Sequence, residues 1–598
     1  MSKFKVLTGI FPAVLFIFGG FFSVGIAAPT ADFAVTKTAD DGTIGTLRWA
    51  ISQSNSNGVP DLIYFSIPTL DPNYDSSNGW WTITVSSSLG ALPSLTEGGT
   101  TINGFTAGNE NPNGLEIVID GSSLGGTMSI LTIQSDNNRI EGLTLQKAPG
   151  AGINIILGAS YNTITNNYIG TDANGMLIWG NATGIKISSG ANHNTVDQCI
   201  ISGNDEDGVL ITGNNTDDNI VKRSYIGLNA AGMGKLPNGW DGVAIVNDAE
   251  DNIIGGSLES QADHRNVISG NNQRGVYLSG EDTIHNEIKY NYIGINKSGG
   301  GTPDVGNLTY GIMLEDGPDA NQIYFNVVSG NKAHGVYLTG TGTTYNWIKN
   351  NIIGADPGLN TIIPNGLHGV AIYNGANHNE VGDDYSYWLR NVIVGSGWSG
   401  IAVVNSWENN LYYNIIGTDK PFSMKKMGNN FHGIDIVNSW ENEVGMNYIA
   451  YNGTSAVRSG IEVEGSTALS NTISMNNIHD NSGGGIDLVS GGNKNLPAPT
   501  ITAADCTKVE GSTTCLGCRI EIFSDWGAQG KHYEGYVIAH SVLPQFSWSG
   551  TARGPNMTVT ATDYKSSDPT DYKNTSEFSL PWLGACHTGY FPVIFKNN

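Results

Sequence analysis

The chain has 598 residues, of which 80 are glycine and only 14% are charged, and its formal net charge is −25. This acidic balance excludes the usual nucleic-acid binders, because a polyanionic partner needs a basic stripe and none is visible. It permits calcium, but the Gly-Gly-x-Gly-x-Asp nonapeptide of calcium-binding β-rolls is absent. We therefore expect no cofactor, with calcium as the one ion that the composition allows.

Residues 1–28 have the pattern of a secretory signal peptide. Lys3 and Lys5 precede an apolar run, and small residues lead to Ala28. Pro29 follows directly, so cleavage a residue or more away fits the pattern as well, and an uncleaved anchor is the alternative. No later stretch is apolar for long enough to span a bilayer. We expect a secreted or extracellular protein, either soluble or attached to the cell surface.

The next segment, 29–120, has the features of a solenoid cap followed by the first coils. Residues 33–36 form a short apolar strand pattern, and Leu47, Ala50 and Ile51 then fall at helical spacing. A short amphipathic helix suits a cap, since the end coil of a solenoid otherwise exposes an open apolar core and unpaired strand edges.

Between residues 121 and 495 one phrase recurs: a glycine, an aliphatic residue, a variable residue and another aliphatic. The intervals run from 24 residues (Gly184 to Gly208) to 36 residues (Gly275 to Gly311). Alternation at period two predicts a strand, and two more short apolar runs lie between successive phrases. Three short strands per repeat predict a parallel β-helix. An antiparallel sandwich is the alternative, but it does not repeat one phrase at nearly constant spacing.

Two further features of the repeat bear on function. The first aliphatic of each phrase, from Val209 to Ile486, should stack inside the rod and stabilise it strongly. The longer coils carry an excursion after Tyr-Ile-Gly or a variant of it, as at 168–170 and 225–227. These excursions should line up along one edge, where surface loops on a rigid scaffold often bind ligands.

The cap segment also carries a resemblance. Gly-x-Leu-Arg-x-Ala-Ile at 45–51, followed by asparagine, resembles the entry signature of exported bacterial right-handed parallel β-helix repeat proteins of the pectate-lyase-like superfold. The resemblance continues through 92–93, 101–104 and 119–121 and implies an all-β solenoid. Right-handed winding follows from it and from the general preference of parallel crossovers. Such families include surface proteins, adhesins and carbohydrate-active proteins, so the resemblance constrains function weakly.

Residues 496–582 alternate strongly and predict a small β-sandwich. Cys515-Leu516-Gly517-Cys518 resembles the start of a bacterial immunoglobulin-like module. In an exported protein, cysteines 506, 515, 518 and 586 are expected to form disulfides rather than a zinc site, so no metal ligands are assigned. Cys199 is expected to be a buried core thiol. The tail, 583–598, is either a sorting signal or a final strand.

The variable position of the phrase should face outward, with successive members about 4.8 Å apart. Its last three members are Asp435, Glu462 and Asp487, with Glu464 on the same face and His432 just before the Gly433 phrase. Carboxylates at this spacing suit an acid/base pair for glycan cleavage or a cation site. A solvated acidic face is the simpler alternative.

Aromatic residues lie close to this acidic stretch. Asn-Ser-Trp-Glu-Asn occurs at 405–409 and again at 438–442, so Trp407 and Trp440 should stack. Trp398 and Phe431 share another column. Aromatic rings suit the apolar faces of sugars, although covering the corner of the rod is an equally ordinary role for them.

The catalytic motifs of known β-helix enzymes are missing: the chain has neither Asn-Thr-Asp nor Arg-Ile-Lys. We therefore expect a β-helix protein that presents an extended, adhesin-like surface to a polysaccharide or cell-surface glycan. The alternative is a glycoside hydrolase or polysaccharide lyase with Asp435, Glu462 and Asp487 as its catalytic groups. Whether it is an enzyme, and its oligomeric state, stay open.

Overall fold

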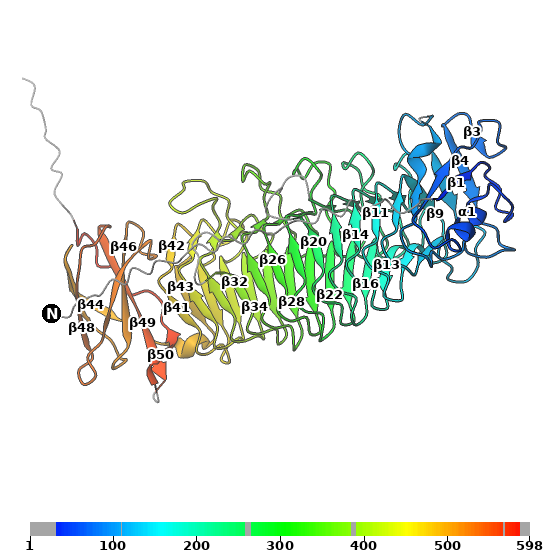
Figure 1. The fold of residues 1–598 in the computed structure, drawn as a ribbon. Coiled ribbons are helices and arrows are strands. Elements are labelled where there is room, and N and C mark those ends of the chain that lie inside the picture. The colour runs from blue at the N-terminus through cyan, green and yellow to red at the C-terminus, as the bar shows by residue number, and fades with distance from the viewer. Residues whose placement is uncertain (1–30, 109, 257–264, 384–389, 566–567, 587–598) are drawn as a thin grey trace, which may run out of the picture.

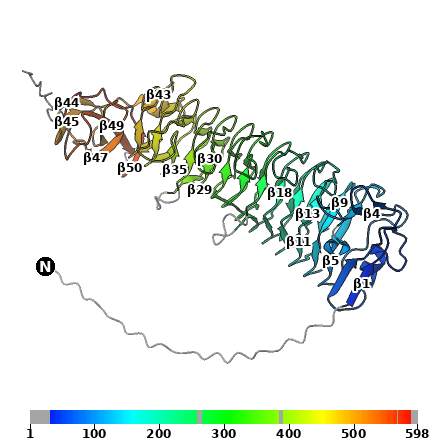
Figure 2. The ribbon, with the colours of Figure 1, turned by 90° about the horizontal axis from the view of Figure 1, so that it is seen from above.

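The computed structural model describes residues 31–108, 110–256, 265–383, 390–565 and 568–586. The predicted signal peptide and most of the tail lie outside these residues. The described chain forms a long rod, with a cap at its N-terminal end and a separate module at its C-terminal end (Figures 1 and 2). Among the described residues, no helix combines the length and hydropathy needed to cross a bilayer.

The rod is a right-handed parallel β-helix of three sheets, as predicted. Sheet A consists of β1 (Ala31–Val35), β2 (Asp61–Phe65), β5 (Thr101–Asn103), β8 (Arg139–Glu141), β11 (Thr163–Thr165), β14 (Thr195–Asp197), β17 (Ile220–Lys222), β20 (Ile253–Gly255), β23 (Glu287–Lys289), β26 (Gln322–Tyr324), β29 (Trp347–Lys349), β32 (Glu380–Gly382), β35 (Asn410–Tyr412), β38 (Glu443–Gly445) and β41 (Thr472–Ser474).

Sheet B consists of β3 (Tyr74–Asp75), β4 (Trp80–Thr84), β6 (Ile117–Asp120), β9 (Leu143–Gln146), β12 (Tyr168–Ile169), β15 (Ile200–Ile201), β18 (Tyr225–Ile226), β21 (Val267–Ile268), β24 (Tyr292–Ile293), β27 (Val327–Val328), β30 (Ile352–Ile353), β33 (Val392–Ile393), β36 (Ile415–Ile416), β39 (Tyr448–Ala450) and β42 (Asn477–His479).

Sheet C contains the repeated phrase, and its strands begin at the residue after the glycine or just before it. It consists of β7 (Leu131–Ile133), β10 (Ala151–Ile155), β13 (Thr183–Ser188), β16 (Val209–Thr212), β19 (Val243–Val246), β22 (Val276–Ser279), β25 (Ile312–Glu315), β28 (Val336–Thr339), β31 (Val370–Tyr373), β34 (Ile401–Val404), β37 (Ile434–Val437), β40 (Ile461–Glu464) and β43 (Ile486–Val489).

The interior is one apolar core that runs the length of the rod. The predicted aliphatic column is fully buried from Val209 to Ile461. Buried asparagines stack at the corners between the sheets: Asn286, for example, donates its backbone N–H and its Nδ2 to Asn321 Oδ1, at 2.8 and 3.0 Å. Each ladder satisfies buried backbone groups where a corner leaves the sheet pattern. Cys199 occupies such a corner and is fully buried, as predicted, and burial raises its pKa to about 12.

The N-terminal end is closed by α1 (Leu47–Ser54), the predicted amphipathic helix, with η1 (Gly104–Ala107) in a later coil. Leu47, Ala50 and Ile51 point into the core. Arg48 forms an ion pair with Asp40 at 2.7 Å and donates to two backbone carbonyls of the segment at 90–91. The helix therefore covers the open end of the first coil, which is what a cap must do.

The excursions line up along one edge, as predicted, because they all follow strands of sheet B. Neighbouring excursions hydrogen-bond to each other: Ala230 N–H donates to Gly175 O at 2.9 Å, and Lys297 N–H to Gly232 O at 3.1 Å. Leu228 and Ile295 from two of them pack on outward side chains of sheet B in a separate apolar cluster. The excursions thus form a second layer that covers sheet B.

The C-terminal module has two antiparallel sheets around a shared core, which confirms a small β-sandwich. One sheet is β44 (Thr500–Ala504), β45 (Lys508–Ser512) and β48 (Gln545–Ser549); the other is β46 (Arg519–Asp525), β47 (His532–Ile538), β49 (Asn556–Lys565) and β50 (Asp568–Thr575). An immunoglobulin-like topology stays a prediction.

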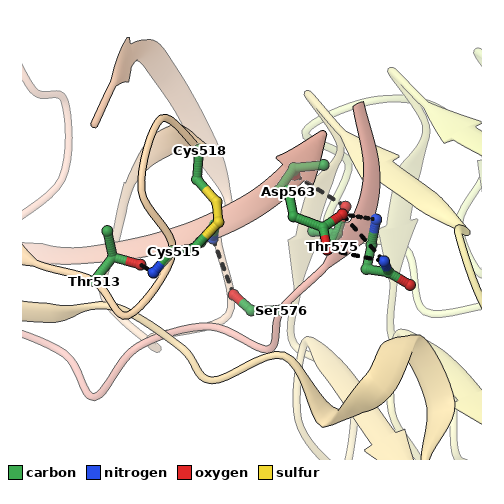
Figure 3. The surroundings of a disulfide bond; sticks show 9 residues. Thr513, Cys515, Cys518, Asp563, Thr575 and Ser576 are labelled. Carbon is green, nitrogen blue, oxygen red and sulfur yellow. Dashed lines mark hydrogen bonds between the residues drawn. A yellow bond between two sulfur atoms is a disulfide. The ribbon is translucent and has the colours of Figure 1, made fainter. Parts of the chain in front are cut away.

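Figure 3 shows the surroundings of the disulfide between Cys515 and Cys518 in this module. Cys506 and Cys586 are free thiols in the structure, so only one of the two disulfides that four cysteines allow is present. The two free thiols are nevertheless neighbours: burial and the Cys506 thiol together raise the pKa of Cys586 to about 12.

The module closes the C-terminal end of the rod. After η3 (Gly492–Asn495), side chains of the module accept hydrogen bonds from backbone N–H groups of the last coil. Met475 donates to Glu521 at 2.8 Å, and Leu488 donates to Glu577 at 3.0 Å. Phe578 packs against the end of the core. Since these groups would otherwise form a bare strand edge, the module acts as the second cap.

Candidate functional site

The candidate site is the outer face of sheet C between β22 and β43, called the sheet C face below. Its side chains come from four positions of each coil: the two residues before the glycine of the phrase, the variable residue, and the residue after the second aliphatic. Outside the interior and the C-terminal module, the apolar clusters found among the described residues both lie over sheet B. The sheet C face therefore keeps its side chains free of an apolar cover.

A continuous row of rings lies along this face. The Tyr310 ring stacks on His334 with centroids 5.5 Å apart, and His334 stacks on His368 at 5.3 Å. Trp398 meets His368 edge to face at 5.2 Å. The row ends at Phe431, 6.1 Å from Trp398. These are the separations at which aromatic pairs attract each other.

A second row runs beside the first and consists of Tyr337 and Tyr373, whose ring centroids are 5.5 Å apart. Tyr337 also lies 5.0 Å from His334, so the two rows form one aromatic surface. Trp398 is the most open member, with 47% of its surface exposed.

The histidines of this surface are neutral donors. His368 Nδ1 accepts the backbone N–H of Ser399 at 3.2 Å, and His334 Nδ1 accepts that of His368 at the same distance. A nitrogen that accepts carries no proton, so in the neutral ring the proton lies on Nε2. Burial lowers the pKa of His334 to about 4 and, with help from His334, that of His368 to about 3. Each ring is therefore uncharged at neutral pH, with its proton on Nε2.

The variable column differs from its prediction in the middle of the rod. It was expected to face solvent, yet Ala371 and Ala402 are completely buried and Met313 is only 5% exposed. The side chains of Ala371 and Ala402 point away from the core but are short, and the neighbouring side chains of Tyr337 and Tyr373 are longer. The alanines thus form the floor beneath the aromatic surface.

The acidic residues predicted at the end of the face do come together. Asp435, Glu462 and Asp487 are cross-strand partners on β37, β40 and β43. His432 Nε2 lies 3.4 Å from Glu462 Oε1, while its Nδ1 accepts the backbone N–H of Ser459. Burial lowers the pKa of His432 to about 4. The pair is thus a neutral imidazole beside a carboxyl group.

Two of these carboxyl groups are not simply solvated. Asp435 Oδ1 is buried and has no hydrogen-bond partner among the described residues. Burial, and then the charge of Glu464, raise the pKa of Asp435 to about 6. Burial, followed by Asp435, raises the pKa of Glu462 to about 7. At neutral pH the pair therefore holds protons part of the time, which a solvated acidic face does not.

Trp407 and Trp440 stack as predicted, with centroids 4.9 Å apart and planes at 8°. They lie beyond the ends of β34 and β37, at the corner toward sheet A, where a β-bridge joins them. The stack uses one face of each ring, which leaves less aromatic surface for a ligand than Trp398 offers.

The column of residues that directly precede the glycines is also charged toward the N-terminal end of the rod. Arg274 binds Asp241 through two nitrogens, at 2.8 and 2.9 Å, and lies 3.6 Å over the ring of Tyr277. Asp207 is next in the column, and burial and then Asp241 raise its pKa to about 7. At this end Arg274 is the counter-ion of Asp241, and the two side chains hydrogen-bond to each other.

One group among the described residues could hold a metal ion: Glu250, Asp251 and His285 place ligand atoms within 4.8 Å of one another. It lies off the sheet C face and is mostly exposed, and such acidic groups are common without an ion. Calcium therefore stays an expectation.

The sequence prediction missed four contributors to the face: Tyr310, Tyr373, Arg458 and Ser399. The first two stand in the columns on either side of the variable one, so reading all three columns together would have found them. Arg458 lies 4.8 Å over Phe431 and lowers the pKa of Asp435 and Glu462 against the effect of burial. It stands two residues before Gly460, in the column of Trp398 and Phe431, but that column was read for aromatic residues alone.

Comparison with known proteins adds little. No family model matches the chain, and no curated protein matches it either. Among solved structures, it is similar to the A-module of the mannuronan C-5 epimerase AlgE4 from Azotobacter vinelandii, with 13% identity over 73% of this chain and 93% of that chain (TM-score 0.37).

Two tailspike proteins are also similar. The Dettilon tailspike shows 15% identity over 87% of this chain and 75% of its own (TM-score 0.40). The tailspike of the E. coli bacteriophage HK620, solved in complex with a pentasaccharide, shows 11% identity over 84% and 88% (TM-score 0.35).

Proposed function

We propose that the protein binds a polysaccharide or cell-surface glycan along the sheet C face. The observation that carries this proposal is the uncovered aromatic surface, in which two rows of rings lie over a floor of buried alanines. Sugar rings present apolar C–H faces to aromatic platforms, and the neutral imidazole N–H groups of His334 and His368 can donate to hydroxyl or ring oxygens.

The length of the face suits a chain rather than a single sugar. The rings from Tyr310 to Phe431 span five successive strands, β25 to β37, at about 4.8 Å per strand. A pre-formed linear surface binds an extended polymer without paying the entropy of ordering a loop.

The negative charge at the C-terminal end of the sheet C face limits which glycans can bind there. Asp435, Glu462, Glu464 and Asp487 face one arginine, Arg458, so this end is acidic. A neutral or amino-substituted glycan therefore fits better than a polyuronate, which like-charge repulsion would weaken. We propose such a glycan as the ligand and an exported or surface location as its setting.

The test is retention on immobilised glycans. The protein is passed over a β-glucan, a mannan, chitosan and polygalacturonate, and we expect retention on at least one of the first three and none on the last. Trp398→Ala should weaken binding about tenfold, or about 1.4 kcal/mol. Trp347→Ala is the matched control, because Trp347 is 44% exposed but lies on sheet A. Absence of retention on every glycan, or equal losses in both variants, would contradict the proposal.

A second candidate function is glycan cleavage at the acidic end. It is favoured by the neighbouring carboxyl groups of Asp435 and Glu462, since such cleavage needs one protonated and one ionised carboxyl group. In this proposal Asp435 and Glu462 are the acid/base pair, with Asp487 next in the column.

Its test is product release from the retained glycan. Asp435→Asn and Glu462→Gln should each lower the rate at least a hundredfold while retention persists. Glu443→Gln, on the outer side of sheet A, is the control and should change nothing. If the unmodified protein retains the glycan but releases no product, the cleavage proposal fails and the binding proposal stands.

A further inference from the structure

A cavity of about 560 Å³ lies at the opposite end of the rod, on sheet B. It is formed by the outer side of β4, β6 and β9, near the cap (Figure 1), and by the first excursion, residues 171–179. Its volume is within the range of roughly 300–1,000 Å³ that is usual for small-ligand sites. Neither the aromatic rows nor the acidic residues of the sheet C face contribute to it.

The floor of the cavity is polar and organised. Asp120 and Gln146 are cross-strand partners on β6 and β9 and are 5% and 2% exposed. Gln146 Nε2 and Lys147 Nζ both donate to Asp120 Oδ2 at 2.9 Å, and the Ser122 N–H donates to Asp120 Oδ1 at 2.8 Å. The buried charge is thus paired, as a buried carboxylate must be.

Two tryptophans line the cavity, Trp80 from β4 and Trp179 from the excursion. Lys147 Nζ lies 3.7 Å from the Trp179 ring centre, which holds the ring beside the polar floor. Trp179 is nevertheless 38% exposed, and Leu177 next to it is 57% exposed. An open aromatic rim over a buried polar floor is an arrangement for a ligand with both kinds of surface.

The excursion that forms this wall is fixed in place. The Leu115 N–H donates to Ala173 O at 2.9 Å, and Asn111 Nδ2 to Asn174 Oδ1 at 3.1 Å. Asp172 Oδ1 accepts the N–H groups of Met176 and Leu177 at 2.7 and 2.8 Å. The cavity is therefore part of the built structure.

The residues beneath the first excursion differ from those beneath the later ones, which indicates that the first excursion does more than pack on sheet B. Farther along sheet B, the outward residues under the excursions are apolar, as Val267, Tyr292 and Val327 are, and the excursions pack on them directly. Under the first excursion the corresponding positions are Thr144 on β9 and Val118 on β6, with Asp120 and Gln146 beside them. Polar residues therefore join the apolar Val118 on the outward side of sheet B where the cavity opens.

Hydrogen-bonding capacity remains for a ligand. Asp172 is 7% exposed and uses only Oδ1 in its turn, and Gln146 uses only Nε2. Asp172 Oδ2 and Gln146 Oε1 have no hydrogen bond to any described residue. Both are acceptors, so they suit a ligand that brings hydroxyl groups.

We propose that this cavity is a saccharide-binding site that takes one or two neutral pyranose units. The rings of Trp80 and Trp179 contact the C–H faces of the sugar, and Asp172 and Gln146 accept its hydroxyl groups. Anionic sugars are excluded, because Asp75, Asp120 and Asp172 outnumber the one lysine in the lining. The site does not depend on the function of the sheet C face.

The test is saturation-transfer NMR on the full chain with glucose, galactose, mannose, cellobiose and lactose, each at 5 mM. We expect transfer to at least one of them, and a loss of at least fivefold in Trp179→Ala. Gln146→Leu keeps the volume of the floor but removes its acceptor together with its hydrogen bond to Asp120, and it should show a similar loss. Circular dichroism and the unfolding midpoint establish that both variants fold.

As a control, the two variants are also made in a Trp398→Ala background, where transfer through the sheet C face is weakened and the fivefold loss should persist. Transfer that persists in Trp179→Ala and in Gln146→Leu would overturn the proposal, as would the absence of transfer from all five sugars. Transfer lost only in Trp398→Ala would assign the sugar to the sheet C face and so overturn this site while supporting the other.

Discussion

Sheets B and C are built from the same coils, yet their outer faces differ. Sheet B carries apolar residues outward, and the excursions pack on them, so that Leu228 and Ile295 are completely buried although they lie outside the solenoid interior. Sheet C carries rings, imidazoles and carboxyl groups outward, and no described residue forms such an apolar layer above them.

The difference shows what the excursions do. Each long coil carries its excursion directly after its sheet B strand. The outward side chains beneath most excursions are apolar and pack against them. Among the described residues the sheet C face has no such cover, and Trp398, 47% exposed, makes its aromatic surface accessible to a partner. In the described part of the chain, the first excursion departs from this division, because it lies over a polar cavity.

The largest expected effect on stability tests whether the excursions act as a structural layer over sheet B. Leu228→Ala should lower the free energy of unfolding by about 2–5 kcal/mol, because it leaves a cavity between an excursion and sheet B. Leu210→Ala makes the same change at a half-exposed position on sheet C and should cost less than about 1 kcal/mol. Hydrogen exchange and urea unfolding of the two variants measure the difference. Equal costs would mean that the excursions are not a structural layer.

The next effect tests the titratable groups of the uncovered face. The folded pKa of His334, about 4, lies below its ordinary value of 6.5. Between these values the unfolded chain binds more protons, so the stability due to the neutral ring is complete above pH 6.5 and declines as the pH falls toward 4. The loss is about 3 kcal/mol.

His334→Gln should remove this part of the pH dependence, measured as unfolding midpoints from pH 7 to pH 4. His285→Gln is the matched control, because His285 is exposed at a corner. The comparison with the unmodified protein is needed because Asp435 and Glu462, whose pKa values are raised, act in the opposite direction. An unchanged slope in His334→Gln would contradict the buried, neutral state of the ring.

The smallest effect concerns the corner between sheets C and A. If the stacked pair of Trp407 and Trp440 serves to pack the corner, a double-mutant cycle with alanine should give a coupling energy of about 0.5–1.5 kcal/mol in stability. Glycan retention should then change less in Trp440→Ala than in Trp398→Ala. A larger loss of retention in Trp440→Ala than in Trp398→Ala would indicate that the glycan binds at the corner.

Much of the scaffold could be predicted from the sequence. Alternation in the phrase located the strands of sheet C, helical spacing located α1, and the equal position of Trp407 and Trp440 predicted their stacking. These predictions succeeded because a solenoid converts equal sequence positions into neighbours. The closing of the last coil by Glu521 and Phe578 could not be predicted, because it depends on how two separate folding units dock.

The candidate site was predicted only in part. Asp435, Glu462 and Asp487 were found by reading one column, and the structure places them in register. The raised pKa values of Asp435 and Glu462 depend on burial by side chains from other columns and on Arg458, which stands in the column of Trp398 and Phe431, so no single column reveals them. The excursions were expected to carry binding, but most of them cover sheet B.

The sequence by itself determined the parallel β-helix, its inward column and the position of the acidic stretch, because these follow from periodicity along the chain. Only the tertiary structure decided which outer face is covered, which rings meet diagonally and where a polar cavity remains. Those outcomes depend on side-chain length and on contacts between columns. The same Gly-aliphatic-x-aliphatic phrase therefore has buried Ala371 as its variable residue in one coil and the carboxyl group of Glu462 in another.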